Sequence, residues 1–133
     1  MRIIIAGGRD FNDMEFLEKS CHESFSTLSE EGLLTNDVRI DIPNMEIVCG
    51  KARGADTLGE KFAKNYGIKV KYFPADWNSL GKSAGYKRNK QMAEYAKEKN
   101  GVLIAFWDKK SKGTKHMIDL ANSNGLKVFV YNY

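Results

Sequence analysis

The nine residues Cys49–Thr57, with the sequence CGKARGADT, decide how this chain is expected to fold. Before them, the residues Met45–Val48 are typical of the end of a buried strand. After them, Leu58, Phe62 and Ala63 recur at helical spacing. A strand that turns through glycines into a helix leaves the first helical N–H groups free, at the positive end of the helix dipole. Such a turn favours the binding of a phosphate or a carboxylate group.

Individual residues of this stretch fit the same interpretation. Gly50 and Gly54 would let the backbone turn tightly and approach a ligand closely. Lys51 and Arg53 add positive charge beside the turn. Asp56 fits an N-cap or first-turn position, or it could point at a ribose hydroxyl. An ordinary strand–helix turn with a solvated lysine and arginine stays open as the alternative.

Length and composition predict one soluble globular domain over residues 1–133, because 42% of the residues are hydrophobic and 29% are charged. No apolar run approaches the roughly 20 residues that cross a bilayer. The apolar stretch after Met1 is too short for a signal peptide. We therefore expect a cytoplasmic protein that does not contact a membrane. Cys21 and Cys49 lack metal-ligand spacing, so we expect buried reduced thiols and no metal site.

The charge is distributed unevenly along the chain. Residues 1–50 carry 4 Lys and Arg against 10 Asp and Glu, a balance of −6. Residues 51–133 carry 17 Lys and Arg against 7 Asp and Glu, a balance of +10. A basic second half is compatible with a nucleic acid or an anionic small molecule, but most of these lysines fall on polar helix faces. Charge alone therefore does not decide the function.

The apolar patterns predict strands and helices in strict alternation. Strands are expected at 2–6, 45–49, 68–73, 102–106 and 127–131, and helices from about 14 to Gly32, at 56–66, at 85–99 and from about 114 to Gly125. Polar and apolar residues alternate along the strand at 68–73, which is typical of a strand near a sheet edge. Residues 33–44 show no sustained period and are expected to form a loop or small excursion. This alternation predicts an α/β fold, a mainly parallel five-stranded sheet with helices on both faces.

Four polar or glycine-bearing segments follow four of the predicted strands, at 7–11, 50–56, 75–89 and 107–114. The carboxyl ends of parallel strands meet at one edge of a sheet, where ligands bind near the reversal of strand order. One glycine turn is weak support for a ligand site, but four at one edge predict a ligand cleft.

The motifs at this edge resemble those of a known family. The matching residues are Gly7–Phe11, Gly50–Asp56, Pro74–Trp77, Gly81–Met92 and Phe106–Thr114. Together they cover nearly the whole chain in order and resemble the YspA-like family of the SLOG (SMF/DprA–LOG) superfamily. The resemblance implies a Rossmann-like fold that binds nucleotides or their derivatives, in some members as a sensor. It also implies a bacterial or phage protein, in the host cytoplasm if a phage encodes it.

LOG-type phosphoribohydrolases of this superfamily cleave nucleoside monophosphates with a Gly-Gly-x-Gly-Thr-x-x-Glu turn and an upstream arginine. The resemblance aligns Gly113 and Thr114 with that turn and Arg88 with the upstream arginine, but Met117 stands where the catalytic Glu would be. Cleavage of an N-glycosidic bond needs a carboxylate. Only Asp10, Asp56, Asp76 or Asp108 could replace the missing Glu.

These arguments give a set of candidate ligand-binding residues. Glycine turns at 7–9, 50–54 and 111–114 would hold phosphates. Arg53, Lys82 and Arg88 would neutralise them, and Asp56 or Asp76 would contact ribose. The full set is Gly7, Gly8, Arg9, Asp10, Gly50, Lys51, Ala52, Arg53, Gly54, Asp56, Asp76, Trp77, Lys82, Arg88, Asn89, Ser111, Gly113 and Thr114.

Several of these residues have a structural alternative. Arg9 could pair with Asp10 or Asp13 instead of a ligand. Trp77 could stack on a base or pack as a buried indole. Arg88 and Asn89 lie on the core-facing side of their helix, so each needs a polar partner from the protein or from a ligand.

The first functional hypothesis is binding or sensing of a nucleotide or nucleotide derivative, NAD-like, ADP-ribose-like or a nucleoside phosphate. The second is a nucleotide N-glycosidic-bond hydrolase or transferase with Asp56 or Asp76 as its carboxylate. The third is single-stranded nucleic-acid binding, which would weaken steeply with salt. No cofactor is indicated apart from the nucleotide-derived ligand. A homo-oligomer through the helix face at 86–99 stays open.

Overall fold

The computed structural model describes residues 1–133 and contains five strands. The strands are β1 (Arg2–Gly7), β2 (Glu46–Cys49), β3 (Lys69–Tyr72), β4 (Gly101–Trp107) and β5 (Lys127–Asn132). All neighbouring pairs are parallel, and the order across the sheet is β3-β2-β1-β4-β5. The prediction of an α/β fold is therefore confirmed as a Rossmann-like arrangement, with a sheet that is parallel throughout.

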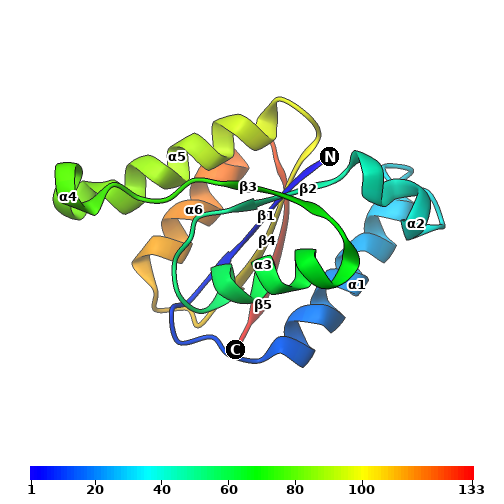
Figure 1. Ribbon diagram of the computed structural model, residues 1–133, viewed down its shortest axis with the longest axis horizontal. Helices are drawn as coiled ribbons and strands as arrows, with labels where there is room; N and C mark the ends of the chain where they lie inside the picture. Colours follow the sequence, from blue (N-terminus) through cyan, green and yellow to red (C-terminus); the bar gives the residue numbers. More distant parts are fainter.

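Helices cover the sheet on both sides. The helices of the chain are α1 (Met14–Glu30), α2 (Val38–Asp41), η1 (Ile42–Asn44), α3 (Ala55–Tyr66), α4 (Trp77–Leu80), η2 (Gly81–Ser83), α5 (Ala84–Lys97) and α6 (Lys112–Ser123), of which α1, α3, α5 and α6 pack on the sheet. The core under α1 and α3 is separate from the core under α5 and α6. Figure 1 shows the sheet between these two helix pairs. No helix has both the length and the apolar character that crossing a membrane requires.

Strand β1 supplies side chains to both cores in alternation. Ile3 and Ile5 belong to the core under α1 and α3, whereas Ile4 belongs to the core under α5 and α6. These three side chains are at most 1% exposed. A strand that is buried on both faces must be apolar at every position, which explains the continuous run that predicted it. Full burial of such a side chain contributes about 1.5–3 kcal/mol.

Strand β3 lies at one edge of the sheet, as its alternating sequence predicted. It pairs with β2 on one side, and three of its four residues are exposed. The mostly buried strands of the sheet are β1, β2 and β4. The loops that follow these three strands are therefore anchored on rigid elements.

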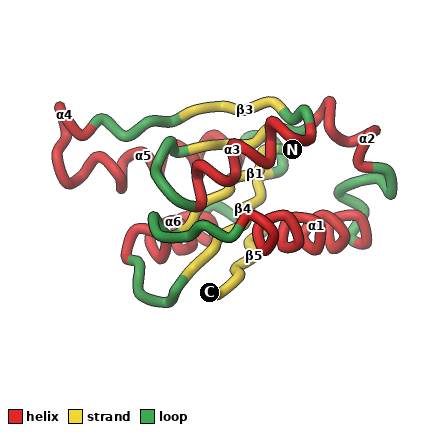
Figure 2. The backbone as a smooth tube through the Cα atoms, turned by 60° about the horizontal axis from the view of Figure 1, so that its bottom comes forward, coloured by secondary structure: helices red, strands yellow, loops and turns green.

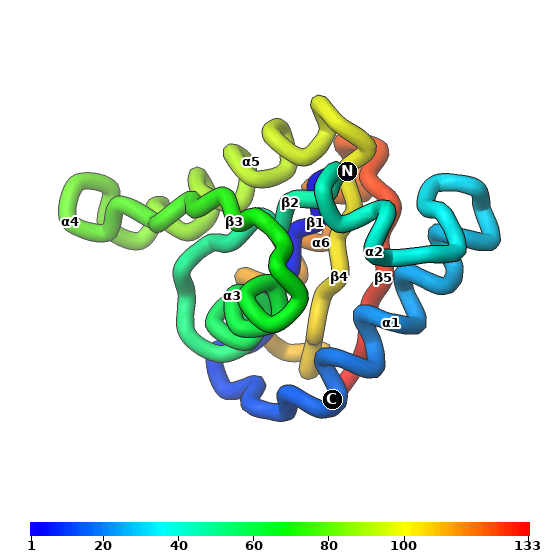
Figure 3. The backbone as a smooth tube through the Cα atoms, turned by 45° about the vertical axis from the view of Figure 1, so that its right-hand side comes forward, coloured from blue at the N-terminus to red at the C-terminus, as the bar shows by residue number.

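The segment 33–44 is not a uniform loop, because it contains α2 and η1. Asp37 caps α2 by accepting a hydrogen bond from the N–H of Arg39 at 3.0 Å. Asp41 is buried and accepts hydrogen bonds from the backbone and hydroxyl of Thr35. The segment joins the end of α1 to the start of β2, at the amino edge of the sheet. In Figure 3, α2 accordingly lies beyond the end of α1 and far from α4.

The segment 75–85 also differs from a plain connector. It contains α4 and η2, and Gly81, which ends α4 and begins η2, has a φ of 57°. Figures 1 and 2 show α4 at the far end of an arm that extends from β3 and returns along α5. The arm brings residues of a long connection to the carboxyl edge of the sheet.

Both cysteines are free and buried, as the sequence predicted. Burial raises the pKa of Cys21 to about 12 and that of Cys49 to about 11. Neither thiol is therefore a nucleophile at neutral pH.

Candidate ligand-binding site

The strand order reverses between β1 and β4. From β1 the chain proceeds to β2 and β3 on one side, and β4 and β5 lie on the other side. The loops that follow β1 and β4 diverge at this point, which leaves a crevice at the carboxyl edge. A cavity of about 460 Å³ lies at this edge and is lined by residues of both loops.

Most of the candidate residues line this main cavity. They are Gly7, Gly8, Arg9, Asp10, Ala52, Asp56, Trp77, Lys82, Arg88, Asn89, Ser111, Gly113 and Thr114. The four predicted loops thus contribute to one cavity, which lies where parallel topology requires it. Whether these residues bind a ligand stays a prediction.

A second, smaller hollow of about 350 Å³ adjoins the main cavity and is called the outer hollow below. Three further candidates, Gly50, Lys51 and Arg53, line the outer hollow but not the main cavity. The two hollows share Arg9, Ala52, Trp77 and Arg88 along their common border.

Two candidates line neither hollow, and each has a structural role instead. Asp76 caps α4 by accepting a hydrogen bond from the N–H of Ser79 at 3.2 Å. Gly54 has a φ of 76° and lies against the backbone of Gly8 and Arg9, where a Cβ atom would overlap the Gly8 carbonyl. Both residues shape the loops of the site without facing the cavity.

Asp56 is the buried carboxylate of the site, with 5% of its surface exposed. It lies in the first turn of α3 and accepts a hydrogen bond from the N–H of Ala52 at 3.3 Å. Burial raises the pKa of Asp56, although Arg88 and the backbone of Ala52 and Gly50 act in the opposite direction. The carboxyl group therefore stabilises the turn of the loop at 50–54 and reaches the cavity wall.

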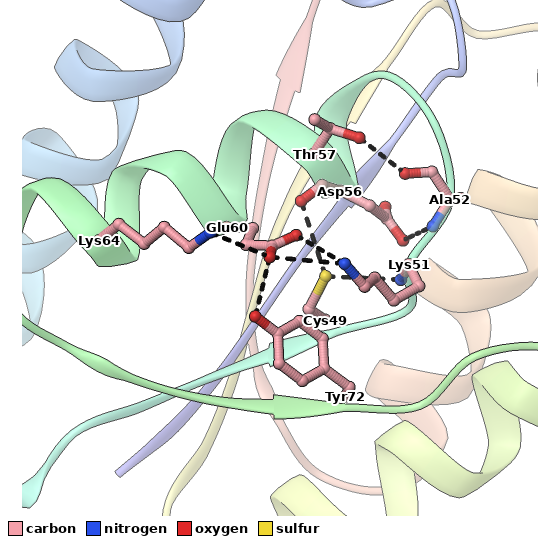
Figure 4. Close-up of polar contacts among 8 residues, drawn as sticks. All are labelled: Cys49, Lys51, Ala52, Asp56, Thr57, Glu60, Lys64 and Tyr72. Atoms are coloured by element: carbon pink, nitrogen blue, oxygen red, sulfur yellow. Dashed lines mark hydrogen bonds and ion pairs between the residues drawn. The ribbon is translucent and has the colours of Figure 1, made fainter.

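The β2–α3 turn is held by a network on its outer side, drawn in Figure 4. The Lys51 ammonium lies 3.3 Å from Glu60 and over the ring of Tyr72. Glu60 also accepts a hydrogen bond from the Tyr72 hydroxyl at 2.8 Å and pairs with Lys64. The charge of Lys51 is thus compensated within the protein. Arg53, by contrast, is exposed and pairs with no carboxylate of the chain.

Arg88 and Asn89 find their polar partners within the protein. Arg88 donates to the carbonyl of Gly50 and, at 3.1 Å, to the side-chain oxygen of Asn89. Asn89 in turn donates to the carbonyl of Gly113 at 3.3 Å and to Nδ1 of His116 at 3.2 Å. This chain of bonds ties the β2–α3 turn to the start of α6 through α5. Burial lowers the pKa of His116, which keeps its ring neutral and Nδ1 able to accept.

Arg9 has no carboxylate partner, because its two candidate partners bond elsewhere. Asp10 accepts a hydrogen bond from the Tyr133 hydroxyl at 2.6 Å, and Asp13 caps α1. The Arg9 guanidinium lies 5.6 Å from the ring centre of Trp77, an exposed side chain that lines both hollows. The Trp77 ring and the Arg9 guanidinium therefore lie together on the border of the two hollows, with about half of the Trp77 surface exposed.

The β4–α6 turn forms the opposite wall. Asp108 accepts hydrogen bonds from the N–H groups of Lys110 and Ser111, both at 2.8 Å, and these bonds lower the pKa of Asp108. Ser111 caps α6 by accepting from the N–H of Thr114 at 3.3 Å. The N–H groups of Lys112 and Gly113 have no acceptor within the chain. Free N–H groups at a helix start suit an anionic oxygen.

Several residues that line the main cavity are outside the set of predicted ligand-binding residues. They are Ala6, Gly85, Tyr86, Met92, Asp108 and Met117. Asp108 was considered only as a substitute carboxylate, and Met92 was predicted to face the core, where it does lie. Tyr86 packs edge-on against the ring of His116 at 4.5 Å, and no periodic pattern could reveal this contact.

The fold and the site together define a Rossmann-like α/β protein with a polar, glycine-walled cavity at its strand-order switch. A family model described as "YspA, cpYpsA-related SLOG family" matches residues 1–79, and the chain belongs to this family. The Gene 61 protein of Mycobacterium phage D29 is 32% identical over 87 residues, which are 62% of this chain and 67% of the phage protein. No solved structure matches the chain significantly.

Proposed function

We propose that this protein binds a nucleotide or a nucleotide derivative in the main cavity, as a receptor or sensor. The observation that carries the proposal is the composition of the cavity wall. Three cationic side chains, Arg9, Lys82 and Arg88, lie around glycine turns at the strand-order switch, beside the partly exposed ring of Trp77. Membership of the SLOG family suggests a nucleotide-related ligand as well.

The wall divides into parts that suit the parts of a nucleotide. The turn after β1 and the start of α6 offer backbone N–H groups for phosphate oxygens, since those of Arg9, Asp10 and Gly113 are unpaired within the chain. Trp77 offers a ring face for a base.

A second candidate function is cleavage of an N-glycosidic bond, and the place of Asp56 favours it. Asp56 is the buried carboxylate in the wall of the main cavity, with a raised pKa that suits a proton donor. Asp76, which the sequence also suggested, caps α4 and does not line the cavity. Asp10 and Asp108 also line the cavity, but Asp10 accepts from the Tyr133 hydroxyl and Asp108 from the N–H groups of its own turn. Asp56 is therefore the carboxylate on which a hydrolase or transferase would depend.

A thermal-shift panel tests both candidates. It uses NAD, ADP-ribose, nucleoside monophosphates and a short single-stranded DNA, each followed by chromatography of the recovered ligand. A compound at 100 times its dissociation constant should add about 2.7 kcal/mol to the free energy of unfolding. A shift with the compound recovered intact supports binding. If free base or ribose phosphate forms with wild type but not with Asp56→Asn, the result supports an enzyme.

Two variants show whether the shift comes from the main cavity. Arg88→Met should abolish it, because Arg88 borders both hollows, whereas Lys97→Gln at the far end of α5 removes the same charge and should retain it. A shift with DNA alone, lost between 50 and 200 mM salt, would contradict the cavity proposal and support nucleic-acid binding.

A further inference from the structure

We infer that the outer hollow is a second anion subsite, so that the preferred ligand is a nucleotide with two or more phosphates rather than a nucleoside monophosphate. This inference rests on the proposed nucleotide binding in the main cavity. It concerns a second phosphate group of the ligand, beyond the group that the main cavity would bind.

The first observation is the charge of the outer hollow. Its lining contains four cationic side chains, Arg9, Lys51, Arg53 and Arg88, and no carboxylate. Glu60 compensates Lys51, and Asp56 lies close to Arg88. Asp56 also interacts electrostatically with Arg9, whereas Arg53 pairs with no carboxylate, so the Arg53 guanidinium keeps an uncompensated charge at this hollow. Guanidinium groups bind phosphate through paired N–H donors, which a lysine cannot reproduce.

The second observation is the backbone beside Arg53. The N–H groups of Arg53 and Gly54 have no acceptor within the chain, although Ala52 and Ala55 on either side donate to Asp56 and to Gly8. The first turn of α3 follows directly and adds the positive end of its dipole. A free backbone N–H group and a free guanidinium therefore both belong to Arg53, which lines the outer hollow, and the free N–H of Gly54 follows directly in the chain.

The third observation is that the two hollows are continuous. Arg9, Ala52, Trp77 and Arg88 line both, so a group in the main cavity and a group in the outer hollow would be separated only by this border. Arg88 is anchored to Gly50 and Asn89 and can contact a phosphate on either side. A phosphate chain that passes Arg88 would place its first phosphate in the main cavity and a later one beside Arg53.

The test compares AMP, ADP, ATP and inorganic tripolyphosphate by calorimetric titration in EDTA, with wild type, Arg53→Gln and Lys97→Gln. Arg53 is exposed and unpaired, so its replacement should not impair folding. In wild type, ATP should bind at least about 10-fold more tightly than AMP. Arg53→Gln should remove this preference while the affinity for AMP stays within about 2-fold. Lys97→Gln, which removes an exposed charge remote from both hollows, should keep the preference.

The possible failures are distinguishable. If AMP and ATP bind wild type equally, or if Arg53→Gln weakens both by the same factor, the second subsite is wrong and nucleotide binding stands. If tripolyphosphate alone binds as tightly as ATP, the hollow is a general polyanion surface and the inference is overturned. If none of the three nucleotides binds, the proposed function fails and the inference fails with it.

Discussion

Asp56 and Arg88 come from helices on opposite faces of the sheet and meet at Gly50, over the end of β2. A Cβ atom on Gly50 would lie 2.7 Å from Oδ2 of Asp56 and 2.7 Å from Nη1 of Arg88. Arg88 also donates to the Gly50 carbonyl. The absence of a side chain at this position is therefore what allows the buried carboxylate and the guanidinium to approach each other.

Gly50→Ala should separate these two groups without displacing the backbone. The atoms that a methyl group meets first belong to the side chains of Asp56 and Arg88, which would have to leave their bonds to Ala52, Gly50 and Asn89. We expect the free energy of unfolding to fall by about 1–3 kcal/mol and nucleotide affinity to fall about 10-fold. Urea unfolding and calorimetric titration measure the two effects. Unchanged affinity would show that the Asp56–Arg88 geometry does not matter for binding.

Gly54→Ala should instead destabilise the fold. Gly54 has a φ of 76°, and a Cβ atom there would overlap the backbone of Gly8, which cannot move as a side chain end can. We expect a loss of about 2–4 kcal/mol from strain and overlap together. Gly32→Ala is the matched control, because Gly32 has a φ of 79° and open space around it, and it should cost only about 1 kcal/mol. Equal losses in the two variants would contradict the close approach of the two loops.

Asp56→Asn should change how stability depends on pH. The folded-state pKa of Asp56 is raised by burial, so its ionisation opposes folding. The contribution of the protonated Asp56 side chain to the free energy of unfolding is fully present below the unfolded pKa of about 3.9. It is lost as pH rises through the folded pKa. The variant removes that loss, so its free energy of unfolding relative to wild type should increase from pH 4 to pH 8. A difference that is constant over this range would rule out a raised pKa.

His116 should stay neutral at pH 6.5. Burial lowers its pKa, and Asn89 donates to its Nδ1 atom, so the proton of the neutral ring is on Nε2. The contribution of the neutral His116 ring to the free energy of unfolding is fully present above the unfolded pKa of about 6.5. It is lost as pH falls through the lower folded pKa. Nitrogen NMR of the ring gives the tautomer and the pKa together. A pKa above 6.5 or an Nδ1-protonated ring would contradict this bond.

The positions of the strands and of most helices could be predicted from local sequence. Central strands such as β1 are buried on both faces and are therefore continuously apolar, and α1 has an apolar stripe that runs from Met14 to Leu28. The short helices α2 and α4 were not predicted because four residues cannot show a helical period. Their start depends on a single capping aspartate, and such a residue looks the same in sequence as a ligand-binding one.

The site was predictable as a set of loops but not as a set of side-chain directions. Parallel topology brings the four loops to one edge, so Gly8, Arg88 and Thr114 meet there although they are far apart in the sequence. Side-chain direction depends on tertiary contacts. Lys51 reaches Glu60 and Asp76 caps α4, whereas Tyr86 turns toward His116. Each of these outcomes is set by a neighbour that only the folded chain supplies.

The connection at 31–45 has a practical consequence for every binding measurement proposed above. It lies at the amino edge of the sheet, and the main cavity and the outer hollow lie at the carboxyl edge. Ile40 on this connection is 61% exposed, and both natural thiols are buried. A cysteine introduced at Ile40 would therefore accept a fluorophore or a surface linker selectively, and the ligand cavity would remain open to solution.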